Sequence, residues 1–219
     1  GLVTTVAWER EDILTYALEV FIQTAGAVVQ WLRDGLQIIK TAAASENLAA
    51  KVSDCGDVYF VPALTGLGAP YWDSAARGAI FGITPGTSRA HIARATLEGI
   101  CFQVRDAVEA MRNDMQIPFT YMRADGAASG NDLLMQMQAD ILGLKIKRFG
   151  RLEATALGHD PFVEVILGER SGDLDRPVAT EVEKHHRVAV LNPSHGFTIL
   201  TRHDKGRQIL IDDLRVFLA

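Results

Sequence analysis

A strand, a loop of small residues and a helix follow one another over residues 119–143, and this succession most constrains the fold. The run FTYMRA has the aromatic and apolar character of a strand. The run NDLLMQMQADILG has the spacing of a helix and ends at Gly143, a residue type that often terminates helices. A second strand pattern, LKIKRF, comes next. Strands that alternate with helices predict an α/β fold with a mixed β-sheet flanked by helices.

The loop between this strand and this helix, Asp125 to Asn131, holds very little side-chain volume. One interpretation is a tight strand-to-helix turn that only needs to be compact. The other is a loop kept bare so that a phosphate can lie on its backbone, because a helix N-terminus presents N–H groups and the positive end of the helix dipole. The spacing alone leaves both interpretations open.

The first part of the chain supplies further strands and a helix. Residues 2–8 and 13–19 are short strand-like segments around a charged turn, which predicts a hairpin. A helix is predicted over residues 24–39 because its apolar residues recur near the 3.6-residue period: Val28, Trp31, Leu32, Leu36 and Ile39. The runs VYFVPALTG and ARGAIFGI are typical of buried strands.

A longer helix is predicted to begin just after Thr87 or Ser88, since either hydroxyl can cap its first turn. Its apolar positions fall on one stripe, as expected for a scaffold helix that faces the core. The stripe consists of Ile92, Thr96, Ile100, Val104, Val108 and Met111.

Composition excludes several classes of partner. The chain has 219 residues, of which 48% are hydrophobic and 22% charged, as in a globular protein with a proper core. Its formal net charge of −5 and the lack of a basic stripe argue against nucleic acid, whose phosphates need clustered Lys and Arg. The sequence contains no apolar run of about 18 residues, the length that a membrane span needs, and no secretion signal is visible. Cytoplasmic localisation is therefore expected, and Cys55 and Cys101 fit it as small buried side chains.

The character of the chain changes after Gly158, where we place a domain boundary. Residues 159–219 form a divergent tail of uncertain fold, in which RVAVLN, FTILT and QILIDDLRVFL have the pattern of strands or of a final short helix. The tail holds five of the six histidines. No metal site is predicted, because His185, His186, His195 and His203 do not match a compact zinc spacing and no cysteine lies near them.

Several long runs closely resemble the C-terminal domain of the glycerol kinases in the FGGY carbohydrate kinase family. They are VYFVPALTGLGAPYWDSAARGAIFGITPGTSRAHIARATLEGICFQVRDAVEAM, RADGAASGNDLLMQMQADILG and EATALG, preceded by GLVTTVAWERED, LTYALE and AGAVVQWLRDGLQII. The resemblance covers residues 1–158. It implies an actin-like, ribonuclease-H-like ATPase domain that closes against an N-terminal domain, with ATP and Mg²⁺ in the cleft between them. The chain is then expected to be a piece of a longer protein.

The resemblance also implies which residues face the nucleotide. Gly26 and Gln30 match the Gly and Gln of the family's AGxxxQW motif, and a spacing of four puts both on one helix face. Gly126, Ala127 and Asn131 match the family's DGG loop and the Asn that follows it, except that Ala127 stands where the family has its second Gly. If the backbone at this position needs a positive φ, the methyl group costs on the order of 1 kcal/mol. With a negative φ, alanine is nearly harmless.

The function implied is the nucleotide-side half of an ATP-dependent glycerol kinase, which transfers a phosphoryl group from ATP to glycerol and gives glycerol 3-phosphate. The catalytic Asp, the glycerol-binding residues and the phosphate loop of these kinases lie in the N-terminal half. No catalytic residue is therefore carried over, and the chain alone is expected to be inactive. ATP or ADP, glycerol through the N-terminal domain, and further copies of the chain in a homo-oligomer are the expected partners.

Two alternatives to a kinase half stay open at this stage. The chain could be a non-catalytic module that keeps the actin-like fold for binding or subunit contact. It could also be a truncated gene product with neither role.

Overall fold

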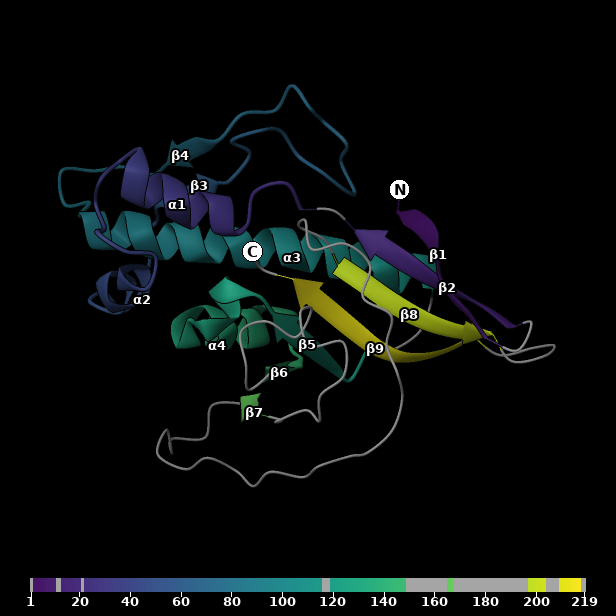
Figure 1. The fold of residues 1–219 in the computed structure, drawn as a ribbon. Helices are drawn as coiled ribbons and strands as arrows, with labels where there is room; N and C mark the ends of the chain where they lie inside the picture. Colours follow the sequence, from purple (N-terminus) through teal and green to yellow (C-terminus); the bar gives the residue numbers. More distant parts are fainter. Residues whose placement is uncertain are drawn as a thin grey trace.

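The computed structural model describes residues 2–10, 13–20, 22–115, 119–148, 165–167, 197–203 and 209–217. Within these residues the chain forms a seven-stranded sheet, a separate two-stranded sheet, four α-helices and one 3₁₀ helix (Figure 1). The predicted combination of helices with a mixed sheet is thus present.

The large sheet contains both parallel and antiparallel neighbours. Strands β9, β5 and β6 run parallel, and the other neighbouring pairs are antiparallel. The order across the sheet is β1 (Val3–Arg10), β2 (Ile13–Val20), β8 (Phe197–His203), β9 (Ile209–Phe217), β5 (Tyr121–Asp125), β6 (Lys145–Arg148) and β7 (Val165–Leu167). The predicted N-terminal hairpin is confirmed as β1 and β2, with an irregularity in register between Val6 and Trp8.

Three strands from beyond residue 158 belong to this sheet, and β7 is the one at its edge. The runs FTILT and QILIDDLRVFL contribute β8 and β9, which lie between β2 and β5. The run RVAVLN lies outside the described residues. The division of the chain at residue 158 stays a prediction.

The scaffold helix α3 (Arg89–Met115) begins directly after Ser88, as predicted, and runs behind the strands in Figure 1. The backbone N–H of Ser88 donates a hydrogen bond to His91 Nδ1 at 3.0 Å, which satisfies a donor at the helix start. In the predicted stripe Ile92 is half-buried and the other five residues are buried. Helices α2 (Ala44–Ala49) and α4 (Asp132–Leu142) both pack against α3.

Helix α1 (Gly26–Asp34) is shorter than predicted, since the apolar period continues to Ile39 but the helix does not. The backbone leaves the helix at Gly35, and Gln37 has a positive φ of 56°, which no α-helix can contain. The N–H of Leu36 donates back to Trp31 O at 2.9 Å and closes the last turn. Ile39 lies in the segment after the helix and is buried there, whereas Leu36 is exposed.

The two predicted buried strands form a small sheet with an exposed face, which corrects the prediction. Strands β3 (Tyr59–Val61) and β4 (Ala79–Phe81) pair antiparallel, with Tyr59 opposite Phe81. Phe60 points inward and packs against Trp31, with ring centroids 5.7 Å apart. Tyr59 and Phe81 are 59% and 58% exposed. Successive side chains of a strand point to opposite faces, so a short apolar run does not require burial of both.

The two cysteines are free and buried, as predicted. Burial is the main cause that raises the pKa of both thiols, and a hydrogen bond with Glu98 adds to the effect at Cys55. The Cys101 thiol donates to Leu134 O at 3.7 Å and so joins α3 to α4. None of the helices in the described ranges is long and apolar enough to cross a membrane.

Candidate functional site

The small-residue loop lies where the parallel strands of the sheet end. Strand β5 pairs in parallel with β9 on one side and β6 on the other, so the carboxyl ends of all three strands meet at one edge. The chain leaves β5 at Asp125, forms the 3₁₀ helix η1 (Ala127–Gly130), and enters α4. Ligands of open α/β sheets bind at the carboxyl ends of the strands. The loop is therefore in the place that a ligand site requires.

The backbone of the loop needs glycine at one position only. Gly126 has φ 90° and ψ 169°, a conformation essentially confined to glycine. Ala127 begins η1 and is not among the described non-glycine residues with positive φ, which are Gln37, Asp57 and Trp72. Alanine at position 127 therefore carries no backbone penalty. Its side chain is exposed.

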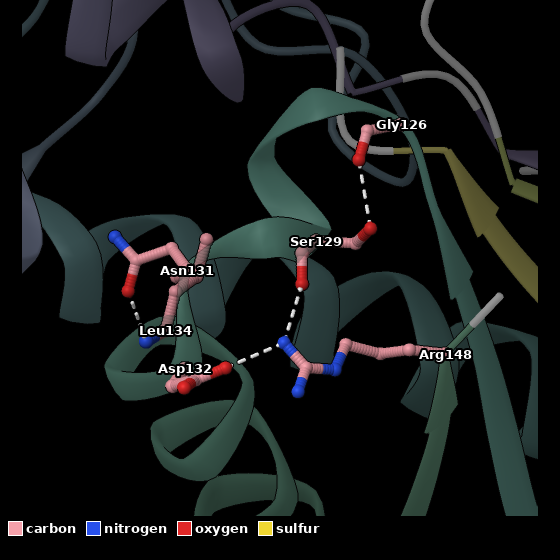
Figure 2. A network of polar contacts seen from close by, with 6 residues as sticks. All are labelled: Gly126, Ser129, Asn131, Asp132, Leu134 and Arg148. Atoms are coloured by element: carbon pink, nitrogen blue, oxygen red, sulfur yellow. Dashed lines mark hydrogen bonds and ion pairs between the residues drawn. The ribbon is translucent and has the colours of Figure 1, made fainter. Parts of the chain in front are cut away.

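Ser129 closes the loop through two hydrogen bonds to Gly126. The Ser129 N–H and the Ser129 hydroxyl both donate to Gly126 O, at 3.0 and 2.7 Å. Ser129 is 3% exposed, so these bonds are shielded from water. Together they fix the distance between the glycine and the end of the 3₁₀ turn (Figure 2).

Asn131 caps helix α4 and retains donor capacity. Its Oδ1 accepts a hydrogen bond from Leu134 N at 2.8 Å, as in a standard N-cap, which typically contributes about 1 kcal/mol. Its Nδ2 lies 3.4 Å from Ser45 Oγ on α2 and donates to it. The Asn131 amide carries two N–H groups, and the contact with Ser45 uses one of them, so the other can donate to a ligand.

Arg148, at the end of β6, connects this strand to the loop through hydrogen bonds. Its Nη1 donates to Ser129 O at 3.1 Å and to Asp132 Oδ1 at 2.6 Å. Figure 2 shows the guanidinium between the Ser129 carbonyl and the Asp132 carboxylate. The Arg148 side chain is 17% exposed and that of Asp132 is 71% exposed. The ion pair thus lies at the first turn of α4.

Arg148, Ser129 and Ser45 are not among the site residues predicted from the sequence. A signal for Arg148 existed in the strand–helix–strand pattern, because a parallel return strand ends beside the strand before the helix. The observed register places Arg148 opposite Ala124, two residues before the glycine of the loop. Ser129 and Ser45 carry no comparable signal in the sequence.

Gly26 and Gln30 lie one turn apart on α1. Gly26 is the first residue of the helix and is half-buried, and Gln30 is exposed. The buried residues of α1 are Val28, Val29 and Leu32, which fix the helix to the core. Near its end, Arg33 donates to Asp34, with Nε and Oδ1 2.7 Å apart, and this hydrogen bond lowers the pKa of Asp34.

Both groups of predicted site residues belong to elements around α3. Helices α1 and α4 each pack against α3 (Figure 1). A second connection runs from α1 through residues 35–43 to α2, where Ser45 contacts Asn131. That Gly26 and Gln30 face the same ligand as the loop at Gly126 stays a prediction.

The side chains that the structure describes contain no group of three or more His, Cys, Asp and Glu residues able to hold a metal ion. The tail histidines lie outside those described side chains.

The fold and the loop together define an α/β domain whose small-residue loop lies at the carboxyl ends of its parallel strands. The sequence model of the C-terminal domain of the FGGY family of carbohydrate kinases matches residues 3–159. The chain belongs to this family.

Glycerol kinases are among the known relatives that the chain resembles. The chain is 57% identical over 158 residues to glycerol kinase from Parabacteroides distasonis and 54% identical over 158 residues to that from Desulfitobacterium hafniense. Each match covers 72% of this chain and 32% of the relative, so the chain spans about a third of the length of these curated relatives.

A solved structure with the same fold comes from Plasmodium falciparum. Its glycerol kinase, crystallised with ADP, has a TM-score of 0.67 and 39% sequence identity, covering 72% of this chain and 31% of that one. The predicted α/β class with an actin-like ATPase fold is thereby confirmed.

Proposed function

We propose that this chain is the nucleotide-side half of an ATP-dependent glycerol kinase, an enzyme that moves a phosphoryl group from ATP to glycerol. The observation that carries the proposal is the loop after β5, with bare backbone at Gly126 and a capped helix start at Asn131. It occurs in a chain 39% identical to a glycerol kinase solved with ADP. The chain alone is expected to be inactive, because it spans about a third of such enzymes.

The residues of the loop fit a nucleotide. Gly126 has no side chain to keep a ligand off the backbone, and the exposed Ala127 adds only a methyl group. The N-terminus of α4 offers partial positive charge to an anionic group. Asn131 offers its second amide N–H. In this proposal Gly26 and Gln30 bind the same nucleotide from α1, with the Gln30 amide as a hydrogen-bonding group.

Mg²⁺ belongs to this proposal as a companion of the nucleotide. In phosphoryl transfer the metal neutralises the charge on the phosphates. The described part of the chain has no acidic cluster that would hold the ion by itself. We therefore propose that Mg²⁺ enters with ATP, and that the catalytic base and the glycerol site belong to the part of the enzyme not covered by this chain.

Self-association is proposed from the resemblance, and the location and the exclusion of nucleic acid and membrane from the composition of the chain. We propose self-association into a homo-oligomer and a cytoplasmic location, with no nucleic acid or membrane as partner. The rival function is a non-catalytic module that uses the actin-like fold for binding or subunit contact.

Nucleotide titration followed by thermal unfolding separates the two functions. A ligand that binds only the folded chain stabilises it by about 2.7 kcal/mol when its concentration is 100 times its Kd. We expect the melting temperature to rise with ADP or with ATP and Mg²⁺, and the rise to shrink in Gln30→Ala. Gln136→Ala is the matched control, since Gln136 lies on α4 and its amide is engaged by Asp140 at 2.9 Å.

A constant melting temperature at millimolar nucleotide would favour the non-catalytic module. If the nucleotide raised the melting temperature of the Gln30 and Gln136 variants equally, the proposal that α1 contacts the nucleotide would be wrong.

A further inference from the structure

We propose that Arg148 is a positioning residue that sets the shape of the loop 126–131 for the nucleotide. This inference rests on the proposed function, because it concerns the same site. Arg148 does not need to touch the ligand. It acts through Ser129 and Asp132, which lie on either side of the loop's end.

One nitrogen of Arg148 joins two elements. Nη1 bonds to the carbonyl oxygen of Ser129, in η1, and to the carboxylate of Asp132, the first residue of α4. Charge-assisted hydrogen bonds of this kind are stronger than those between neutral groups. The angle between the 3₁₀ turn and the helix is therefore set from β6, a strand that belongs to the rigid sheet.

A chain of hydrogen bonds carries this constraint to the glycine. Arg148 holds the Ser129 carbonyl, and Ser129 holds Gly126 O through both its N–H and its hydroxyl. From the other side, Asn131 is fixed by Leu134 N and by Ser45 on α2. Release of Arg148 would remove the bond from β6 to Ser129, the residue that donates to Gly126 O.

Charge gives Arg148 a second effect on the same ligand. Asp132 places a negative, mostly exposed carboxylate at the helix end where a phosphate is expected to bind. A like charge there would repel the phosphate. Arg148, 2.6 Å from that carboxylate, offsets its charge.

The ion pair between Arg148 and Asp132 is expected to contribute little to the stability of the fold. One partner is largely exposed, and exposed ion pairs contribute little to folding. Nucleotide affinity and loop dynamics are therefore expected to change more than the melting temperature does.

The test compares Arg148→Ala, Arg148→Lys and Arg105→Ala in the 219-residue chain. Arg148→Ala is expected to raise the Kd for ADP about tenfold, the effect of losing a hydrogen bond to a charged group. Amides 126–134 should also exchange hydrogen faster without nucleotide. Arg148→Lys should recover most of the affinity, because a single ammonium nitrogen can replace Nη1. Arg105→Ala, which removes the 2.7 Å pair with Glu109 on α3, should match the wild type.

The outcomes distinguish this inference from the proposed function. If the wild-type chain binds ADP and Arg148→Ala binds it equally well, the inference is overturned and the proposed function stands. Equal losses in the Arg148 and Arg105 variants would also overturn it. If the wild-type chain does not bind ADP, the proposed function and the inference both fail.

Discussion

Replacement of Leu134 by alanine is expected to lower the free energy of unfolding by about 2–5 kcal/mol. Leu134 is 1% exposed and belongs to the core. Both backbone polar groups of Leu134 are hydrogen-bonded: its N–H donates to Asn131 Oδ1, and its carbonyl accepts from the Cys101 thiol. The variant leaves a cavity in the core beside the cap of α4. Urea unfolding followed by circular dichroism measures the loss.

Leu133 is the matched control for this variant. It is the preceding residue and also a leucine, but it is only half-buried at the edge of the core. Leu133→Ala is therefore expected to cost clearly less. Equal costs for the two variants would show that α4 does not pack as described.

Replacement of Gly126 by alanine is expected to cost about 1–3 kcal/mol and to abolish measurable nucleotide binding. The cost is that of a non-glycine residue held in a region essentially confined to glycine. Gly126 has φ 90° and ψ 169° there, and its carbonyl is the acceptor for both bonds from Ser129. To relieve the strain the loop must move, and the backbone proposed to face the nucleotide moves with it. Urea unfolding and ADP titration of the same variant measure the two effects.

Gly143→Ala separates loop geometry from general strain. Gly143 also has a positive φ, 62°, and a methyl group there would meet nothing within 4 Å. The variant should lose on the order of 1 kcal/mol of stability and keep its nucleotide affinity. Similar affinities in the two glycine variants would contradict a nucleotide site at Gly126.

The limits of α4 were predictable from sequence because capping is a local property. Asn131 and Gly143 act at the two ends through their own side-chain chemistry and backbone freedom. The stripe of α3 was predictable for a similar reason, since a long periodic pattern leaves only one face for the core.

The end of α1 and the burial of β3 and β4 were not predictable in this way. The apolar period continues past Gly35, but the positive φ of Gln37 directs Ile39 into the core by a different path. In β3 and β4, side chains on both faces are apolar, and only the three-dimensional arrangement decides which face is covered.

The candidate site was predictable where its residues are neighbours in sequence. Gly126, Ala127 and Asn131 occur in one loop with the predicted cap. The brace by Arg148 was missed because it depends on the parallel pairing of β5 with β6, a contact between distant segments. Whether Ala127 is tolerated depends on the sign of its backbone φ, which no sequence pattern reports.

Hydrogen exchange of the 219-residue chain with and without ADP tests the central claim most directly. If α1 and the loop form one wall of a nucleotide site, saturating ADP should slow exchange in residues 26–34 and in residues 126–134 together. Binding that protects only one of these segments, or neither, would contradict a shared site.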